Sequence, residues 1–284
     1  MDARQASGGK LDWLIAADGR RLCLHDWPLA GAQAGVLFVH GLGEHAGRYG
    51  ALAAWFNARG YAVRSYDQRG HGRSPGQRGA LSRPLELLED LAQVYGRFAA
   101  MLEAPTLVLG HSMGGLVALR AVLDGYVVPR ALVLSSPALR TWTPAWEQVM
   151  ARRLARILPN LPLRSGLPFE ALSQEAAVVA AYRHDPLRSG WITPRLARFI
   201  FESGPHCIAR AAQLAVPTLL LAAGADRLVD VAGSRAFATA AEAGGWLTTR
   251  LFDGLFHELF NEAQPARGEV LAQLSWWLQV QGLP

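Results

Sequence analysis

Short apolar segments alternate with longer helical patterns along most of this 284-residue chain. The apolar segments are continuous runs, as expected of strands that are buried on both faces. Strands of that kind are joined through helices, which cover the two faces of a parallel sheet. We therefore predict a mostly parallel central sheet flanked by helices. The expected strands cover 35–40, 61–67, 106–110, 130–135 and 217–222, and the expected helices cover 49–59, 84–102 and 113–124.

The two ends of the chain add further elements to this sheet. Residues 20–27 predict an earlier, antiparallel strand. Residues 246–252 predict the last strand, and 263–280 predict a closing helix.

The middle of the chain interrupts the alternation, because no buried-strand run occurs between 139 and 210. Thr143 followed by Pro144 is typical of a helix start. We predict a core domain formed by 1–138 and 211–284, with a mostly helical cap inserted at 139–210. Apolar residues recur at helical spacing in the cap, and they are Trp146, Val149, Met150, Leu154, Ile157, Leu158 and Leu161.

Composition limits the class of protein. Hydrophobic residues make up 51% of the chain and charged residues 18%, which indicates a globular protein with a large core. No run of about 18 apolar residues suggests a membrane span, and residues 1–13 lack an apolar signal-peptide segment. Two cysteines, Cys23 and Cys207, are too few for a disulfide framework. We expect a cytoplasmic protein, which could also contact a membrane peripherally.

The positive charge of the chain is concentrated in the cap. Residues 139–210 contain ten arginines and five acidic residues, which accounts for the whole net charge of +5. No nucleic-acid-binding motif accompanies these arginines, so we predict no nucleic-acid partner. Arg152, Arg153 and Arg156 flank the apolar stripe of the cap, and such a surface could rest on an anionic membrane. The alternative is that the stripe packs on the cap and the sheet while the arginines are solvated.

The segment Gly110-His111-Ser112-Met113-Gly114 matches the G-x-S-x-G nucleophile elbow between a strand and a helix. In such an elbow the serine adopts a strained backbone conformation, and small neighbours prevent clashes with the strand and the helix. We predict that Ser112 is a nucleophile. The alternative is an ordinary glycine-containing turn.

A serine nucleophile needs a base, and the base needs an orienting acid. In this arrangement the chain order is serine, acid, histidine. His257 follows the last predicted strand and is our candidate base, whereas His184 and His206 lie in the insertion. Asp226 follows the strand 217–222 and is the candidate acid. Asp230 is the alternative acid, although it fits better as an N-terminal helix residue.

Acyl transfer also needs N–H donors for the developing oxyanion. We expect one from the backbone of Met113, directly after the nucleophile, and one from the backbone of Leu42 in the loop 40–45. The glycine-rich segment 67–74 is typical of an architectural turn. A metal site formed by His40 and His71 is not favoured, so we predict no metal and no organic cofactor.

Five segments of the chain, taken together, resemble those of a known family. They are HGLGEHAGRY at 40–49, DQRGHGRS at 67–74, GHSMGG at 110–115, GADRLVD at 224–230 and FHELFNE at 256–262. Together they resemble the α/β-hydrolase fold, and within it the monoacylglycerol lipase and lysophospholipase group. A further segment, 172–187, looks like the cap of that group. The resemblance spans nearly the whole chain.

The resemblance implies the roles already assigned to Ser112, Asp226 and His257, and it implies a mobile cap that shapes an acyl tunnel. It also implies that Glu44 and Arg48 shape the alcohol side of the substrate pocket. Phe260 stands where the mammalian relatives place a second histidine near the glycerol. This departure weakens the expectation of a strict preference for monoacylglycerols, but not that of ester hydrolysis.

We therefore predict a serine ester hydrolase that acts on a small lipid or ester substrate, either a monoacylglycerol or a lysophospholipid. A broad-specificity carboxylesterase for small esters is the first alternative. A peptidase is less favoured, because the sequence contains no evident acidic pair for a substrate amino group. A non-catalytic hydrolase-like binding protein is a further alternative, although such proteins usually lose a triad member.

Overall fold

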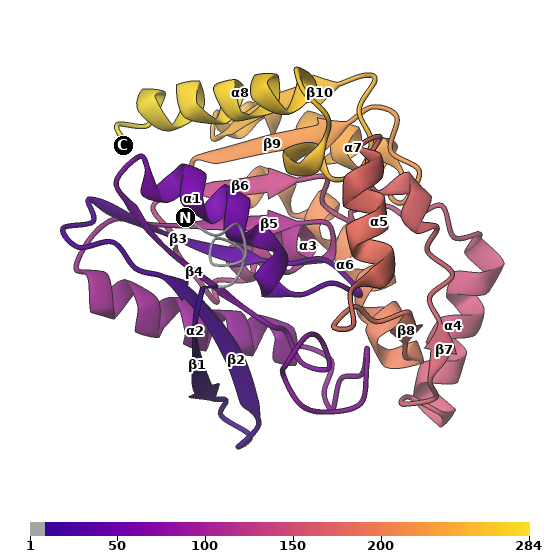
Figure 1. The fold of residues 1–284 in the computed structure, drawn as a ribbon. Helices are drawn as coiled ribbons and strands as arrows, with labels where there is room; N and C mark the ends of the chain where they lie inside the picture. The colour runs from indigo at the N-terminus through magenta and orange to yellow at the C-terminus, as the bar shows by residue number, and fades with distance from the viewer. Residues whose placement is uncertain (1–8) are drawn as a thin grey trace.

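The computed structural model describes residues 9–284 (Figure 1). Its centre is an eight-stranded sheet with the order β1-β2-β4-β3-β5-β6-β9-β10. β1 and β2 are antiparallel to their neighbours, and the remaining strands of the sheet, β4-β3-β5-β6-β9-β10, run parallel to one another. The strands are β1 (Lys10–Ile15), β2 (Arg21–Trp27), β3 (Ala34–Val39), β4 (Tyr61–Tyr66), β5 (Thr106–His111), β6 (Leu132–Ser135), β9 (Thr218–Ala223) and β10 (Leu247–Phe252).

The predicted fold class is confirmed, and each predicted strand has its counterpart in the sheet. β3, β5, β6 and β9 are buried along their whole length, which is why their sequences are largely apolar runs. β4 is also buried throughout, but it includes Arg64, which pairs with Asp26. β1 was not predicted from the sequence. It is an edge strand in which only Leu14 is buried, and its sequence KLDWLI is interrupted by Asp12, so it does not form a continuous apolar run.

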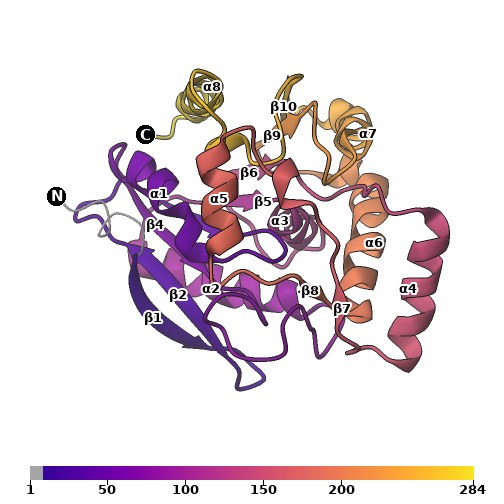
Figure 2. The ribbon, with the colours of Figure 1, turned by 45° about the vertical axis from the view of Figure 1, so that its right-hand side comes forward.

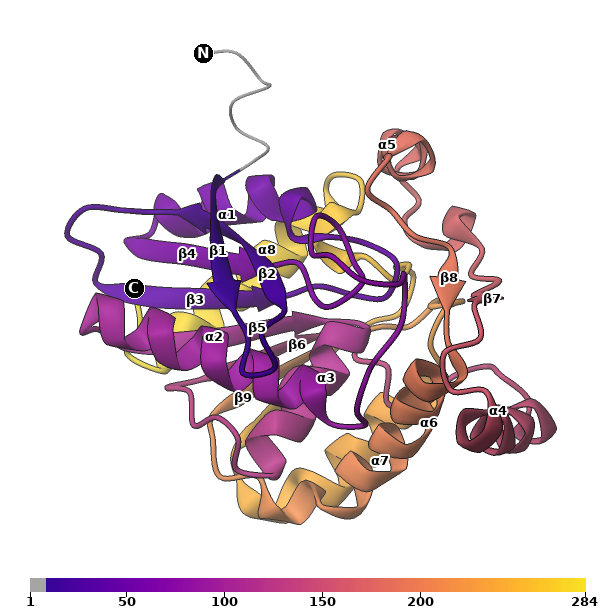
Figure 3. The same ribbon diagram turned by 90° about the horizontal axis from the view of Figure 1, so that it is seen from below.

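Helices cover the two faces of the sheet, as Figure 3 shows. α1 (Gly50–Asn57) and α8 (Ala266–Val280) pack on one face around Phe56 and Trp277. α2 (Glu86–Leu102), α3 (Met113–Leu123) and α7 (Val231–Ala241) pack on the other face. Short 3-10 helices connect these elements at η1 (Ala46–Tyr49), η2 (Phe169–Ala171), η3 (Ala211–Gln213), η4 (Glu242–Gly244) and η5 (Leu259–Asn261).

The predicted cap segment lies at the end of the sheet where the parallel strands terminate (Figure 1). It contains α4 (Ala145–Ile157), β7 (Leu163–Arg164), α5 (Ala176–His184), β8 (Trp191–Ile192) and α6 (Pro194–Ala209). β7 and β8 form a separate two-stranded sheet. The segment is thus mostly helical, as its sequence indicates.

The cap segment contains helices of two kinds. α6 buries Leu196, Phe199 and Ile200 in the same apolar core as α3 and α7, so it belongs to the layer of helices on the sheet. α4 packs on α6 from outside, and none of its residues is buried (Figure 2). The expectation that the apolar stripe packs on the cap and the sheet is wrong for its outer face. Trp146 is 68% exposed and Ile157 is 75% exposed.

Candidate active site

Ser112 lies at the corner between β5 and α3, where its backbone adopts φ 54° and ψ −121°. A non-glycine residue in this region is strained and persists only where the surroundings impose it. Two glycines make the corner possible. A Cβ atom on Gly110 would lie 2.5 Å from the carbonyl oxygen of Gly114, and a Cβ atom on Gly114 would collide with the carbonyl oxygen of Val39. These contacts explain why the sequence places glycine on both sides of Ser112.

Asp226 and His257 come together from two loops at the same edge of the sheet. Asp226 follows β9 and His257 follows β10, and His257 Nδ1 lies 2.6 Å from Asp226 Oδ2. The other carboxylate oxygen, Oδ1, accepts hydrogen bonds from the N–H groups of Leu228 and Val229. A carboxylate only accepts, so Nδ1 carries the proton and Nε2 is left with a free lone pair.

The histidine lies beside the elbow. The ring centroid of His111, which precedes Ser112, is 4.7 Å from that of His257. Burial and the neighbouring His257 lower the pKa of His111 to about 4, so His111 is neutral. The hydroxyl of Ser112 does not cap α3, and no hydrogen bond within residues 9–284 engages it.

Asp230, the alternative acid, has another role. It is the N-cap of α7, where its side chain accepts a hydrogen bond from the N–H of Ala232. Its second oxygen lies 2.9 Å from Nε of Arg140. The interpretation of Asp230 as an N-terminal helix residue is therefore confirmed.

The two residues predicted to supply backbone N–H donors, Leu42 and Met113, lie near this corner. Met113 is the first residue of α3, so its N–H has no acceptor within the helix and lies at the positive end of the helix dipole. Leu42 belongs to the loop after β3, and its neighbour Gly41 lies close to Ser112, since a Cβ atom on Gly41 would be 3.1 Å from Ser112 Cβ. Within the described part of the chain, neither the Leu42 nor the Met113 N–H donates a hydrogen bond.

Comparison with known proteins identifies the family of this chain. The family model Hydrolase_4, described as serine aminopeptidase S33, matches residues 30–264. The chain belongs to the Hydrolase_4 family.

Individual relatives of this Hydrolase_4 chain include a monoacylglycerol lipase of Mycolicibacterium smegmatis, which is 38% identical over 86% of this chain and 87% of the relative. A human monoglyceride lipase is 30% identical over 94% of this chain and 90% of its own length. The crystal structure of a Paleococcus ferrophilus monoacylglycerol lipase superposes with a TM-score of 0.82, at 31% identity, and covers 91% and 98% of the two chains. This chain is thus an α/β-hydrolase enzyme similar to monoacylglycerol lipases, which are carboxylic ester hydrolases.

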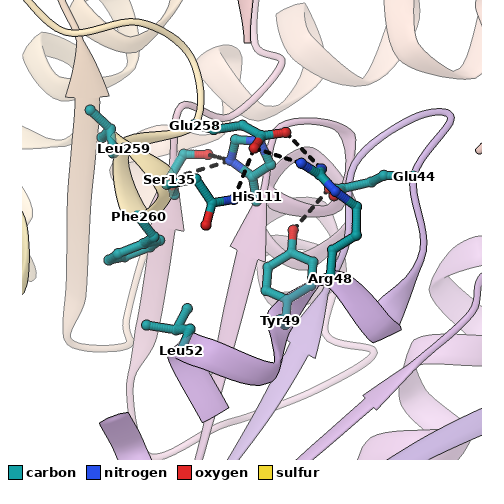
Figure 4. Close-up of a pocket in the computed structure, with 10 residues that line it drawn as sticks. Glu44, Arg48, Tyr49, Leu52, His111, Ser135, Glu258, Leu259 and Phe260 are labelled. Atoms are coloured by element: carbon teal, nitrogen blue, oxygen red, sulfur yellow. Dashed lines mark hydrogen bonds and ion pairs between the residues drawn. The ribbon is translucent and has the colours of Figure 1, made fainter. Parts of the chain in front are cut away.

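A small pocket of the Hydrolase_4 site opens beside His111 and Glu258 (Figure 4). Glu44 and Arg48, predicted on the alcohol side, both line this pocket, and so does Phe260. Phe260 is also buried in the core with α1 and α8. The remaining lining residues are Tyr49, Leu52, Ser135, Leu259 and Asn261.

Glu258 and Asn261 were not predicted from the sequence. Glu258 accepts hydrogen bonds from both terminal nitrogens of Arg48, at 2.7 and 2.8 Å, and from Nδ2 of Asn261, at 2.8 Å. Both residues lie in the segment 256–262, so their closeness to His257 is a signal that sequence reasoning could have used. The partner Arg48 is 210 positions away from Glu258, and no local pattern connects the two.

Arg48 also binds Glu44, whose Oε2 lies 2.6 Å from Nη1 of the arginine. Oε1 of Glu44 accepts the N–H of Gly41 at 2.6 Å and the hydroxyl of Tyr49 at 2.9 Å. Burial alone would raise the pKa of Glu44, but Arg48, the nearby histidines and the Gly41 N–H outweigh it and lower that pKa to about 2. Glu44 therefore stays ionised, and it links the loop after β3 to Arg48.

The histidines of the disfavoured metal site have other partners. Nδ1 of His40 forms a hydrogen bond with the carbonyl of Gly41, and Nε2 accepts a hydrogen bond from the N–H of Gln68. Nδ1 of His71 forms a hydrogen bond with the carbonyl of Arg69, and burial lowers the pKa of His71 to about 3.

Cys23, His25 and Asp67 bring three possible ligand atoms within 4.8 Å of one another, and all three residues are buried. Asp67 already accepts the N–H groups of Ala46 and Arg73, so it holds the segment 67–74 in place. Burial raises the pKa of the Cys23 thiol to about 12, so this thiol is neutral. No helix within residues 9–284 is both long and apolar enough to span a membrane.

Proposed function

We propose that this protein is a serine hydrolase that cleaves monoacyl lipid esters through Ser112, His257 and Asp226. The supporting observation is the 2.6 Å bond between His257 and Asp226, because it leaves Nε2 of the histidine unprotonated beside the elbow serine. Nε2 takes the proton of Ser112 as the hydroxyl attacks the ester carbonyl. The N–H groups of Leu42 and Met113 stabilise the oxyanion.

The tetrahedral intermediate collapses when His257 gives that proton to the leaving alcohol, which departs and leaves an acyl group on Ser112. Water then enters, and Nε2 of His257 removes a proton from it as it attacks the acyl carbonyl. The second tetrahedral intermediate collapses when His257 gives this proton to Oγ of Ser112, so the bond between Ser112 and the acyl group breaks and the fatty acid leaves. Asp226 keeps the ring orientation and stabilises the imidazolium in both half-reactions. Metal ions and organic cofactors have no part in this proposal.

The proposed substrate class is supported by the relatives, among which monoacylglycerol lipases recur. The pocket beside His111 would take the alcohol part of the ester, with Glu44, Arg48 and Phe260 in its lining. A broad-specificity carboxylesterase would use the same mechanism and would differ only in accepting small esters equally well.

Labelling with a fluorophosphonate probe and hydrolysis of monoacylglycerols test this proposal together. Ser112→Ala should abolish labelling and lower kcat by roughly 10³–10⁶-fold while the protein stays folded. Ser234→Ala is the matched control, since Ser234 is a buried serine of α7 away from the elbow, and it should leave both readouts unchanged. Labelling of Ser112→Ala at the level of wild type would contradict the assignment.

We further propose that residues 139–210 act as a cap over this site, with α6 as its anchor on the core and α4 as a surface that rests on anionic lipid. Trp146, Met150 and Ile157 share the outer face of α4 at helical spacing, and all three are exposed. Arg153 and Arg156 are exposed beside them, as a lipid-facing amphipathic helix requires. Each such arginine adds up to about 1 kcal/mol near an anionic surface.

Sedimentation with anionic vesicles measures this contact. The variant Arg152→Gln, Arg153→Gln, Arg156→Gln should bind several-fold more weakly than wild type, and raised salt should have the same effect by screening. The charge-matched control replaces three exposed arginines on other elements, Arg97, Arg235 and Arg250, by Gln. Equal sedimentation of the cap variant and wild type at low salt would remove the electrostatic role of α4.

A further inference from the structure

The guanidinium of Arg48 is shared between two carboxylates in the pocket beside the proposed catalytic residues. Nη1 donates to Glu44 Oε2 at 2.6 Å and to Glu258 Oε1 at 2.7 Å, and Nη2 donates to Glu258 Oε2 at 2.8 Å. Figure 4 shows Arg48 held between these two side chains. Both glutamates are 4% exposed, so water screens their charges poorly.

The other lining residues add no positive charge. His111 is neutral because burial and His257 lower its pKa to about 4. The hydroxyl of Tyr49 donates to Glu44, and the amide of Asn261 donates to Glu258. The lining therefore has two negative charges and one positive charge. The donor groups of Arg48, Tyr49 and Asn261 already form hydrogen bonds with the two glutamates.

We propose that this charge balance excludes esters whose alcohol part is anionic, and that Glu258 is the residue that sets this specificity. The inference rests on the proposed function, because the leaving alcohol must lie beside His257, the residue adjacent to Glu258. A negative charge on that alcohol would enter a buried site that carries a net negative charge and offers no free cation among the described residues. An uncharged polyol such as glycerol meets no such repulsion and finds carboxylate oxygens that can accept its hydroxyl groups.

The opposite reading would make Arg48 an anion receptor, since a buried arginine is the usual ligand of phosphate and carboxylate groups. The geometry disfavours this reading because Glu258 already occupies the bidentate face of the guanidinium. An incoming anion would have to displace Glu258 and leave that carboxylate buried without its partner, which is costly. The two readings predict opposite substrate preferences.

Two nearly isosteric esters provide the probe. One is 1-octanoylglycerol, and the other is 3-O-octanoylglycerate, in which a carboxylate replaces one CH₂OH group. The uncharged amide of the second ester controls for shape. Repulsion between like charges a few ångströms apart in a partly desolvated site predicts that wild type hydrolyses the glycerate ester on the order of 10²-fold less efficiently in kcat/KM than the glycerol ester. The amide ester should remain close to the glycerol ester.

Glu258→Gln tests the assigned residue, because it removes one charge and keeps the shape. We expect it to raise the ratio of kcat/KM for the anionic ester over that for the neutral ester by roughly 10-fold or more. Glu262→Gln is the matched control. Glu262 is a second 4% exposed glutamate in the same loop, but it binds Ser173 and the N–H of Phe256 and does not line the pocket. In the Glu262→Gln variant, the ratio of kcat/KM for the anionic ester over that for the neutral ester should equal the ratio in wild type.

The outcomes are distinct. If wild type hydrolyses the glycerate ester as well as the glycerol ester, or better, the inference is overturned. This result needs no folded Glu258→Gln variant. Hydrolysis of the glycerol ester would still support the proposed function. An unchanged ratio in a folded Glu258→Gln variant, or the same change in Glu262→Gln, overturns the role of Glu258. Failure of wild type to hydrolyse any of the three esters above the level of Ser112→Ala overturns the proposed function and this inference with it.

Discussion

Asp226→Asn is the substitution whose effect follows most directly from the structure. Oδ1 of Asp226 accepts two backbone N–H groups, from Leu228 at 2.8 Å and from Val229 at 2.9 Å. The side-chain oxygen of the introduced asparagine must take this position. The opposite orientation would set its NH₂ group against both donors and leave them unsatisfied, at a cost of about 1–3 kcal/mol for each.

The NH₂ group of the variant therefore faces Nδ1 of His257, where wild type has Oδ2 at 2.6 Å. Because NH₂ only donates, Nδ1 must become the acceptor, and the proton of the imidazole moves to Nε2. Nε2 then has no lone pair for the proton of Ser112. We expect kcat to fall by up to about 10⁴-fold, which corresponds to about 5 kcal/mol of transition-state stabilisation.

The assay is the steady-state hydrolysis of a soluble short-chain ester, together with circular dichroism and the urea midpoint of each variant. Asp230→Asn is the control, because Asp230 caps α7 and pairs with the exposed Arg140. It should change the free energy of unfolding by about 1 kcal/mol or less and leave kcat unchanged. A folded Asp226→Asn variant that keeps kcat within about 10-fold of wild type would contradict this role of Asp226. Loss of activity in Asp230→Asn instead would contradict it as well.

Two further expectations concern stability. A Cβ atom on Gly114 would collide with the carbonyl of Val39, so Gly114→Ala should lower the free energy of unfolding by about 2 kcal/mol or more in urea titrations. Gly96→Ala in α2 meets nothing within 4 Å and should be neutral or stabilising by up to about 1 kcal/mol; equal losses in both variants would contradict the steric argument. Burial opposes the ionisation of Asp67, but His25 and the N–H of Arg73 outweigh it and lower the pKa of Asp67 from 3.8 to about 2. The resulting stabilisation, about 2 kcal/mol, is present above pH 3.8 and is lost as the pH falls toward 2. Asp67→Asn should flatten that part of the pH profile of the urea midpoint, and parallel profiles for variant and wild type would exclude this source.

The sequence alone was sufficient for the features that depend on local pattern. Continuous apolar runs identify most of the buried parallel strands, because these strands have no solvent face that could add polar residues. The elbow around Ser112 is recognisable because strained backbone needs glycine at fixed spacing. The order of the chain then leaves His257 as the only histidine after the last predicted strand. β1 escaped prediction because an edge strand with one buried residue has no such pattern.

Tertiary structure alone decided the features that depend on which segments meet. The sequence showed no acidic pair, yet folding brings Glu44 and Glu258 onto the two sides of Arg48 from opposite ends of the chain. The apolar stripe of α4 and the apolar face of α6 look alike as sequence, but α6 is buried on α3 and α7 while α4 stays exposed. Helical periodicity states which residues share a face, whereas the packing of the remaining chain determines whether anything covers that face. For the same reason the elbow at Ser112 is recognisable in the sequence, but the charge of the pocket beside it is known only from the fold.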